Sequence, residues 1–428
     1  MDSSMWGGAA ALTALAFALT THAAEPLHGW PAYGATPGGT HYSAASQITP
    51  DNVADLALAW EHRSGDMREA GSGTGPGTAS SFQATPILLD GTLYYCSPFN
   101  RVFALDARTG EERWSYDPGV DRNDFVLPNC RGVSSWRSGA QGFCEHRIIL
   151  GTLDARLIAL DAATGEPCPD FGDGGAVDLK AEISPHRSLE YSVTSPPAIL
   201  DDLAITGSLV LDNVRTSAPS GVVRAYDVRT GELRWAWNPV PPEQAPRNPD
   251  GTYRSGTTNV WSIIAVDPAR GLVLVPTGNT SPDYYGGHRD GLDAYSSSVV
   301  ALDGTTGKRV WHFQTVHHDI WDYDVPAQPT LIDLQVDGET VPAVVQVTKM
   351  GLTFVLHRET GEPVFPVEER PVPQGPVPGE YLSPTQPFPT HVPPLLAPIT
   401  EDDAWGLTFW DRGRCRAAIR ELRNDGFY

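Results

Sequence analysis

The sequence predicts an all-β protein that is assembled from repeated, small antiparallel sheets. Three observations carry this prediction: a turn motif that recurs five times, a high content of glycine and proline (42 and 38 of 428 residues), and twelve tryptophans. Frequent turn residues with scattered aromatic side chains are typical of many short strands. A turn motif that recurs along the whole chain indicates stacked or radially arranged units.

The repeat is an apolar strand that runs into Asp-x-x-Thr-Gly, often followed by a strand with a tryptophan. The turn glycines are Gly110, Gly165, Gly231, Gly307 and Gly361, which are 55, 66, 76 and 54 residues apart. The Asp and Thr side chains can accept hydrogen bonds from turn amides, and glycine suits the positive-φ position. The fifth copy is degenerate, because His357 replaces the aspartate.

Each repeat unit is a small sheet that cannot bury both of its faces alone. Radial packing of the units covers these faces and gives a β-propeller, with the tryptophans between neighbouring sheets. The longer segments between repeats are then loops on one face, where we expect function to lie. We count five clear units and a further strand pair near residues 57–63.

The segments outside the repeats are less regular. Thr49 and Pro50 suit an N-cap and a first helical position, which predicts a short helix to about Leu58. The glycine-rich stretch 71–77 reads as a flexible loop, since no strand precedes it and no helix follows it. The proline-rich stretch 363–398 and the tail 405–428 restore no repeat.

The net charge and the N-terminal residues limit which partners and which cellular compartment we expect. The net charge is −22 and the pI is near 4.8, which argues against nucleic acid and anionic membrane surfaces as partners. Residues 1–24 read as a secretory signal that is cleaved after Ala23 or Ala24, although Asp2 stands where a basic residue is usual. An uncleaved anchor is the alternative, and residues 25–428 form the propeller domain.

The five cysteines contain no Cys-x-x-Cys pair, which argues against a zinc site. In an exported protein, Cys130 and Cys144 are candidates for a short-loop disulfide. We expect the other three, Cys96, Cys168 and Cys415, to be small buried apolar residues.

The stretch from Ser296 to Lys349 concentrates the ionisable side chains. Residues 317–324 hold two histidines and three aspartates within eight positions. Trp311, Trp321 and Pro326 flank them and favour burial. Carboxylates among buried aromatic side chains have shifted pKa values, which is how a carboxylate becomes a general base.

The chain resembles the pyrroloquinoline quinone (PQQ) dependent dehydrogenases, and within them the membrane-associated glucose, quinate and polyol dehydrogenases. Besides the tryptophan repeats and Trp321-Asp322, the resemblance rests on Trp30-Pro-Ala-Tyr-Gly34, Cys130-Arg-Gly-Val133, Asp212-Asn213, Gln314-Thr-Val-His-His-Asp319, Pro371-Val-Pro-Gln-Gly375 and Pro384-Thr-Gln-Pro-Phe388. It implies an eight-bladed propeller of four-stranded blades. We therefore expect an incomplete ring of five to six blades, as in a truncated member or a fragment.

The resemblance also implies a reaction and its catalytic residues. In this family PQQ lies near the propeller axis beside a metal ion, and an alcohol carbon gives a hydride equivalent to the quinone while a base takes the hydroxyl proton. Asp322 matches the base, and the alternative is a turn cap. Lys349 matches the lysine that bonds the quinone oxygens, and the alternative is a solvated lysine.

The resemblance assigns metal ligands as well. Asn279 matches an amide ligand of the family, with a loop asparagine or a glycosylation sequon as alternatives. Asp322 is expected to share the metal. Asp212, with Asn213 as its alternative, occupies the region of another ligand, and Asp324 is either a ligand or structural. The expected ion is Ca²⁺, with Mg²⁺ or a lanthanide as alternatives.

Further residues match positions that hold PQQ. Arg131 matches an arginine that pairs with a PQQ carboxylate. Trp261 matches the aromatic floor under the planar cofactor, and the alternative is a tryptophan that packs between blades. Relatives place hydrogen bonds to PQQ at three more positions, which are Gln83, Thr194 and Ser208 here.

The expected function is oxidation of a sugar, polyol or cyclic alcohol in the periplasm, with peripheral membrane association left open. No Cys-x-x-Cys-His motif is present, so a quinone or a separate carrier is expected to accept the electrons. The chain departs from some relatives, because Cys130 has no adjacent cysteine and residues 125–129 contain no histidine. Two alternatives remain: a propeller scaffold without a cofactor, and an inactive truncated fragment.

Overall fold

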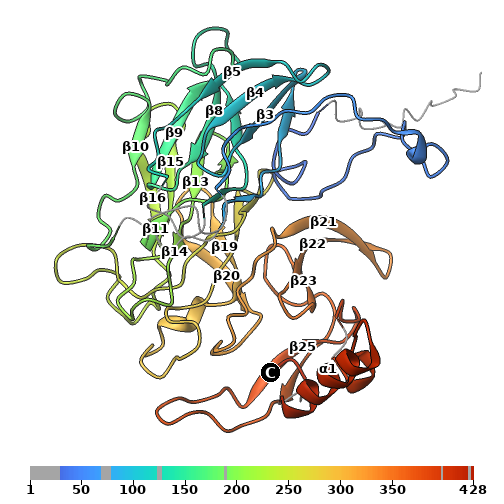
Figure 1. Cartoon of the computed structure of the whole chain (residues 1–428). Helices are drawn as coiled ribbons and strands as arrows, with labels where there is room; N and C mark the ends of the chain where they lie inside the picture. Colours follow the sequence, from blue (N-terminus) through green and yellow to red (C-terminus); the bar gives the residue numbers. More distant parts are fainter. Residues whose placement is uncertain (1–28, 69–78, 123–127, 188–189, 397–398, 423–425) are drawn as a thin grey trace, which may run out of the picture.

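The computed structural model describes residues 29–68, 79–122, 128–187, 190–396, 399–422 and 426–428. The expected signal (1–24) and the glycine-rich stretch 71–77 lie outside these ranges. Strands dominate the described part, and most of them form five consecutive sheets of three or four strands, beside three two-stranded sheets (Figure 1). The all-β prediction is therefore confirmed.

The first four sheets each contain four antiparallel strands. Sheet 1 consists of β2 (Ile87–Leu89), β3 (Thr92–Cys96), β4 (Val102–Asp106) and β5 (Glu112–Tyr116). Sheet 2 consists of β7 (Ser134–Arg137), β8 (His146–Gly151), β9 (Arg156–Asp161) and β10 (Ala176–Asp178). Sheet 3 consists of β12 (Ala198–Leu200), β13 (Leu203–Thr206), β15 (Val223–Asp227) and β16 (Leu233–Trp237).

Sheet 4 consists of β17 (Ala265–Asp267), β18 (Leu272–Pro276), β19 (Ser298–Asp303) and β20 (Arg309–Gln314). Sheet 5 has three strands, β21 (Thr330–Val336), β22 (Glu339–Val347) and β23 (Thr353–His357). The inner strands β7, β12, β17 and β21 pack against one another in this order. The sheets thus follow one another around an axis as propeller blades, and the arrangement is partial, as expected.

The Asp-x-x-Thr-Gly repeats form the predicted turns after β4, β9, β15, β19 and β23. In the first, Asp106 Oδ1 accepts from the amides of Arg108 and Thr109, and the Gly110 amide donates to the Asp106 carbonyl at 2.8 Å. In the degenerate fifth copy, His357 keeps the same carbonyl bond to Gly361, and its Nδ1 accepts from the Glu359 amide.

The tryptophan of one sheet docks on the turn glycine of the next sheet. The indole nitrogen of Trp235 donates to the Gly304 carbonyl at 2.8 Å, and a Cβ on Gly307 would lie 2.5 Å from the Trp235 ring. The same contact joins Trp114 to Gly165 and Trp311 to Gly361. The tryptophan and the turn glycine of the repeat therefore act together: each such contact holds one blade against the next.

Two disulfides correct the cysteine prediction. Cys96 pairs with Cys130 and Cys144 pairs with Cys168, so the Cys130–Cys144 pairing is wrong and Cys96 and Cys168 are not free thiols. Cys130 precedes β7 and Cys144 follows it, so strand β7 keeps them at opposite ends of sheet 2. Sheet 2 has no tryptophan after its turn glycine, and its Cys168 disulfide lies in that stretch.

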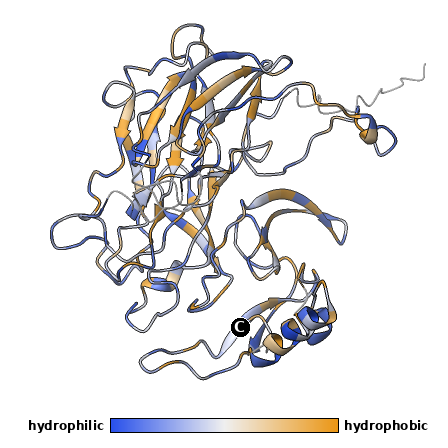
Figure 2. Ribbon diagram, in the orientation of Figure 1, coloured by the Kyte–Doolittle hydropathy of each residue, from blue (hydrophilic) through white to orange (hydrophobic). Residues whose placement is uncertain are grey.

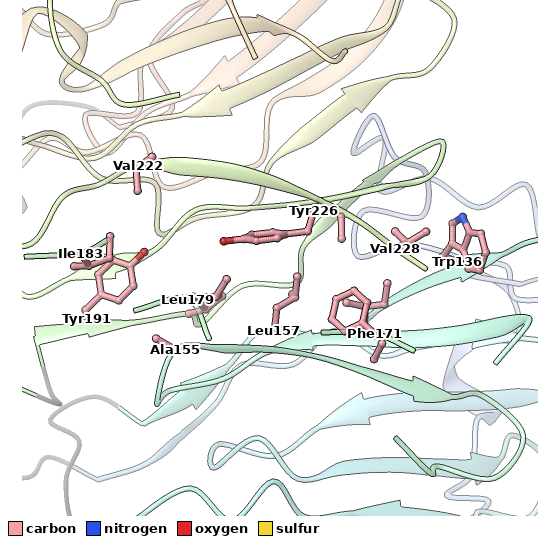
Figure 3. Close-up of a cluster of buried hydrophobic side chains, with 14 of the residues drawn as sticks. Trp136, Ala155, Leu157, Phe171, Leu179, Ile183, Tyr191, Val222, Tyr226 and Val228 are labelled. Carbon is pink, nitrogen blue, oxygen red and sulfur yellow. The ribbon is translucent and has the colours of Figure 1, made fainter. Parts of the chain in front are cut away.

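The hydrophobic core lies between successive sheets rather than at one centre. Figure 2 shows that many strand residues of the sheets are apolar, coloured orange. Between sheets 2 and 3, Leu157, Phe171 and Leu179 face Tyr226 and neighbouring side chains (Figure 3). Comparable clusters lie between the other neighbouring sheets. Each blade therefore needs its neighbours for burial, as the repeat pattern predicts.

The N-terminal lead-in ties separate sheets together. Trp30 pairs with Leu88 of β2 through two backbone hydrogen bonds, the Pro37 carbonyl accepts from Val266 of β17, and the Gly38 carbonyl accepts from Leu331 of β21. Residues 30–38 therefore connect sheets 1, 4 and 5.

Several local predictions outside the sheets are wrong. The expected helix from Pro50 to Leu58 is only a 3₁₀ turn, Val53–Asp55, because no buried face supports a longer one. Residues 57–63 form no strand, although the Trp60 ring packs on Gly110. The tail forms one helix, α1 (Phe409–Glu421), after the two-stranded sheet β24 (Val367–Pro371) and β25 (Thr385–Pro389). No described helix has the length and apolarity to cross a membrane.

Candidate functional site

A cavity of 310 Å³ opens where loops from all five sheets meet. Its wall comes from residues before β2, before β7, in and after β14 (Leu209–Val210), before β17, after β18, between β20 and β21, and after β22. The predicted site residues that line it are Gln83, Arg131, Asp212, Trp261, Asp322, Asp324 and Lys349. Most of the predicted site is therefore brought together from positions far apart in the sequence.

The backbone around Asp322 is shaped to present its carboxylate. Asp322 has a φ of 62°, in the left-handed region that a residue with a side chain rarely adopts. Asp319, which is fully buried, holds this turn: its carboxylate accepts from the amides of Trp321 (2.9 Å) and Tyr323 (2.8 Å) and from the Ser297 hydroxyl (2.5 Å). Burial raises the pKa of Asp319 to about 6 despite these hydrogen bonds.

Lys349 lies directly after β22 and binds the acids of the loop. Its Nζ is 2.9 Å from Asp322 Oδ1, 2.7 Å from the Asp322 carbonyl oxygen and 3.4 Å from Asp324 Oδ2. Burial disfavours the charged amine, but the charge of Asp324 and the hydrogen bond and charge of Asp322 outweigh it and raise the lysine pKa. Lys349 is therefore a fixed cation at the cavity wall.

Trp261 and Arg131 form another part of the cavity wall. The Arg131 guanidinium lies 4.9 Å from the Trp261 ring centroid and donates to the Thr194 hydroxyl at 2.5 Å. It forms no ion pair with any residue that the structure describes, and burial lowers its pKa to about 10. The Trp261 indole nitrogen donates to Asp324 Oδ2 at 3.0 Å.

Asp212 also lines the cavity, and sequence reasoning missed a further acid there, Asp283. Burial first, and the charge of Asp324 next, raise the pKa of Asp212 to about 6. Burial and the charge of Asp212 raise the pKa of Asp283 to about 8. Asp283 is 2% exposed and its Oδ1 has no hydrogen-bond partner. The sequence feature that could have pointed to Asp283 is its position shortly after Asn279 in the same loop.

The two asparagines proposed as metal ligands form hydrogen bonds to the acids of the site or to their backbone. The Asn279 side chain is buried and lies outside the cavity lining, with its Nδ2 donating to the carbonyls of Asp283 and Asp319 at 3.1 Å and its backbone amide donating to Asp324. Asn213 lines the cavity, and its side chain bonds Asp283 twice. A ligand role for either stays a prediction.

Among the described residues, no group of three or more His, Cys, Asp or Glu side chains is arranged to hold a metal ion. The expected convergence of Asn279, Asp322 and Asp212 (or Asn213) on one metal ion, with Asp324 as a further candidate ligand, therefore stays a prediction. Thr194 and Ser208 do not reach the main cavity, and they line a small adjoining space beside Trp261. Gln83 lies at the cavity wall, with its amide donating to Ser81.

The comparisons with known proteins agree with this geometry. Residues 30–428 match the family model "PQQ: Glucose/ethanol/alcohol dehydrogenase, beta-propeller domain". The chain is 40% identical over 410 residues to quinoprotein glucose dehydrogenase of Escherichia coli (strain K12), covering 93% of this chain and 51% of that protein. It is 42% identical over 416 residues to the glycerol dehydrogenase large subunit of Gluconobacter thailandicus, covering 94% and 55%.

A solved structure shares the fold. Quinohemoprotein alcohol dehydrogenase from Comamonas testosteroni superimposes with a TM-score of 0.64 at 27% sequence identity, covering 85% of this chain and 52% of that one. The chain spans about half the length of the relatives it matches. With the family model matching nearly the whole chain, this protein belongs to the PQQ-dependent quinoprotein dehydrogenases.

Proposed function

We propose that the protein takes part in PQQ-dependent oxidation of a sugar, polyol or cyclic alcohol. The observation that carries this proposal is one cavity in which the Asp322–Lys349 pair lies with Trp261 and Arg131. A base beside a fixed cation, together with an aromatic and cationic wall, suits a planar, anionic cofactor and an alcohol. A scaffold without a cofactor has no need of this combination.

The residues present fit PQQ. Arg131 is a half-buried guanidinium without a carboxylate partner among the described residues, so it is available to a carboxylate of a bound molecule. The guanidinium lies 4.9 Å from the centroid of the Trp261 ring, and Trp261 lines the same cavity, which suits a planar ring system. Thr194 orients Arg131 rather than touching the cavity. We infer that Arg131, Trp261 and Lys349 hold PQQ.

The oxygen donors at the cavity also suit a cation in their chemistry, and their side chains have to move closer together to share one. Four aspartates line the cavity (Asp212, Asp283, Asp322 and Asp324), and Lys349 pairs with two of them. Raised pKa values of Asp212 and Asp283 report the cost of their negative charges in this setting. A hard cation with oxygen ligands relieves that repulsion. We propose Ca²⁺, with Mg²⁺ or a lanthanide as alternatives.

The two oxygens of Asp322 have different tasks. Oδ1 is held by Lys349, whereas Oδ2 has no partner closer than the Tyr284 hydroxyl at 3.4 Å among the described residues. Oδ2 is therefore the oxygen that accepts the proton from the substrate hydroxyl. PQQ, when bound, supplies the two-electron acceptor for this oxidation. Lys349 stabilises negative charge that develops nearby.

The relatives support the class of substrate. Their names give glucose and glycerol, and both compounds carry hydroxyls on adjacent carbons. We extend this class, a polyol or sugar, to the present chain, and we propose a quinone or a separate carrier as the electron acceptor. Two disulfides in the described part support export from the cytoplasm, to the periplasm or the outer side of the inner membrane.

The test is reconstitution of the purified chain. PQQ is added with Ca²⁺, Mg²⁺ or La³⁺, and reduction of an artificial electron acceptor is followed with glucose, glycerol, quinate and ethanol. We expect PQQ binding that requires a metal ion, seen as quenching of tryptophan fluorescence, and oxidation of the polyols. Absence of PQQ binding with every ion would overturn the proposal and favour a scaffold. PQQ binding without turnover would show an inactive fragment.

A further inference from the structure

Tyr284 reaches the free oxygen of Asp322 from a separate loop. Its hydroxyl lies 3.4 Å from Asp322 Oδ2, which is longer than a normal O–H···O hydrogen bond. The side chain is 63% exposed, so the hydroxyl is not withdrawn into the core. A phenol keeps its proton at neutral pH and can donate a hydrogen bond. A neutral hydroxyl donor is thus presented beside the proposed proton acceptor.

The backbone on both sides of Tyr284 is fixed. Asp283 before it exchanges two hydrogen bonds with Asn213, and its carbonyl accepts from Asn279 and Arg289. Gly286 after it donates its amide to the Glu380 carboxylate, which in turn pairs with His318. A side chain on such a segment has a defined reach, in contrast to a mobile surface loop.

An aromatic cavity of 410 Å³ adjoins Tyr284. Its lining combines Trp321 and Tyr323, whose rings lie parallel with centroids 6.0 Å apart, with the aliphatic Val377 and Leu382. Asp322, between the two rings in sequence, lines the other cavity, and the Tyr284 hydroxyl lies 3.4 Å from its Oδ2. The aromatic cavity thus lies on the Tyr284 side of Asp322.

We propose that Tyr284 selects substrates with two adjacent hydroxyls, which deepens the proposed polyol oxidation and rests on it. The reacting hydroxyl donates to Asp322 Oδ2, and the hydroxyl on the neighbouring carbon accepts from the Tyr284 phenol. The two oxygens of a vicinal diol are about as far apart as two hydrogen-bonded oxygens, which matches the short separation of Tyr284 and Oδ2. The carbon ring or chain then extends over the aromatic cavity.

Tyr285 provides a matched control. Its ring stacks on His288, with centroids 5.7 Å apart, and it lines neither cavity. Tyr284→Phe and Tyr285→Phe remove the same atom from adjacent positions of one loop. A general effect of hydroxyl loss on folding or on the loop therefore appears in both variants. An effect on diol recognition appears in Tyr284→Phe alone.

The experiment compares cis-1,2-cyclohexanediol with cyclohexanol, which differ by a single hydroxyl. Binding to the whole chain is measured by ligand-observed NMR and by tryptophan fluorescence, first without additions and then with PQQ and Ca²⁺. We expect the wild type and Tyr285→Phe to prefer the diol, and Tyr284→Phe to lose about 2- to 10-fold in diol affinity, as one neutral hydrogen bond predicts. Affinity for cyclohexanol should not change in Tyr284→Phe.

The outcomes separate this inference from the proposed function. Equal diol preference in the wild type and Tyr284→Phe, or no preference in the wild type, overturns the role of Tyr284 even if PQQ binds and turns over. Failure to bind PQQ overturns the proposed function, while diol preference in the absence of PQQ still decides the role of Tyr284. Where turnover occurs, kcat/KM for the diol divided by kcat/KM for cyclohexanol should fall in Tyr284→Phe alone.

Discussion

Lys349 Nζ bonds both the carboxylate and the backbone carbonyl of Asp322, at 2.9 and 2.7 Å. This double contact joins the end of β22 to the loop between β20 and β21. It fixes Oδ1 and leaves Oδ2 toward the site, so one cation both positions the proposed base and compensates its charge. Asp322 and Lys349 therefore act as a unit, yet replacing each should have a different effect.

Asp322→Asn should lower turnover by about 10²–10⁴-fold, the usual contribution of a general base. Asparagine has the same shape, keeps an acceptor for Lys349 and tolerates the left-handed backbone at this position. PQQ binding and thermal stability should therefore stay near wild type. Steady-state turnover and a PQQ titration by fluorescence check this. Near wild-type turnover with PQQ bound would show that Asp322 is a turn residue.

Lys349→Ala should weaken both turnover and PQQ affinity. The variant removes the cation from the cavity and leaves Asp322 and Asp324 without their shared partner. The same two measurements apply, with Lys308→Ala as the control, because Lys308 is an exposed lysine on a blade turn. Should Lys349→Ala bind PQQ as tightly as the control, the lysine serves only to position Asp322.

Much of this arrangement was predictable from sequence because the blade repeat is local. Each Asp-x-x-Thr-Gly turn is stabilised within five residues, so its pattern predicts the turn without knowledge of the rest. The resemblance of motifs predicted Asp322, Lys349, Trp261 and Arg131 as residues of one site. In the structure they line one cavity, although they span more than 200 residues of the sequence. In these cases the sequence carries a strong local or family signal.

The errors arose where long-range packing decides. Cys130 and Cys144 are close in sequence, but strand β7 separates them in space. The segment 50–58 has helix-start signals but no buried face to stabilise a helix. Asp283 and Asp319 act through burial and through hydrogen bonds to side chains far away in the sequence, Asn213 and Ser297, which no spacing reveals.

Metal binding should depend on pH because the cavity acids hold protons in the metal-free chain. The pKa values of Asp212 and Asp283 are raised to about 6 and 8, above the unfolded value of 3.8. The folded chain thus binds more protons than the unfolded chain between about pH 4 and 8. As pH rises through that window, these two groups therefore reduce the free energy of unfolding, and the metal-free chain becomes less stable. A bound cation opposes this loss.

We therefore expect Ca²⁺ to raise Tm more at pH 8 than at pH 5. Asp283→Asn should raise the stability of the metal-free chain at pH 8 and reduce the pH dependence of the Ca²⁺ effect. Differential scanning calorimetry at both pH values, with Mg²⁺ and La³⁺ in parallel, checks this. A Ca²⁺ effect of equal size at both pH values in the wild type would contradict a role for these acids in binding the metal.

The disulfide in sheet 2 should contribute to stability where the tryptophan contact is missing. Cys144 and Cys168 are 24 residues apart, and closing a loop of that length stabilises a protein by about 3.5 kcal/mol in the chain-entropy model. Replacing both by serine should lower the free energy of unfolding in urea by about this amount. Cys415→Ser, at a free cysteine on α1, should change it by less than about 0.5 kcal/mol.

The contact between Trp235 and Gly307 should tolerate no side chain at the glycine. Gly307 has a φ of 68° and an added Cβ would lie 2.5 Å from the Trp235 ring, whereas Gly338 has a φ of 85° with no atom within 4 Å. Gly338→Ala should therefore cost only the left-handed backbone, about 1–2 kcal/mol. Gly307→Ala adds overpacking against the ring, for a total of about 2–5 kcal/mol.

The double variant Gly307→Ala/Trp235→Leu separates the two contributions to the cost at Gly307. Removing the ring makes room for the new Cβ, so the alanine should cost less in the Trp235→Leu background than in the wild type. Urea unfolding of the two single variants, the double variant and Gly338→Ala provides the comparison. If Gly307→Ala and Gly338→Ala cost the same, the glycine is required only for its backbone angle, and the tryptophan does not fix the two blades through this contact.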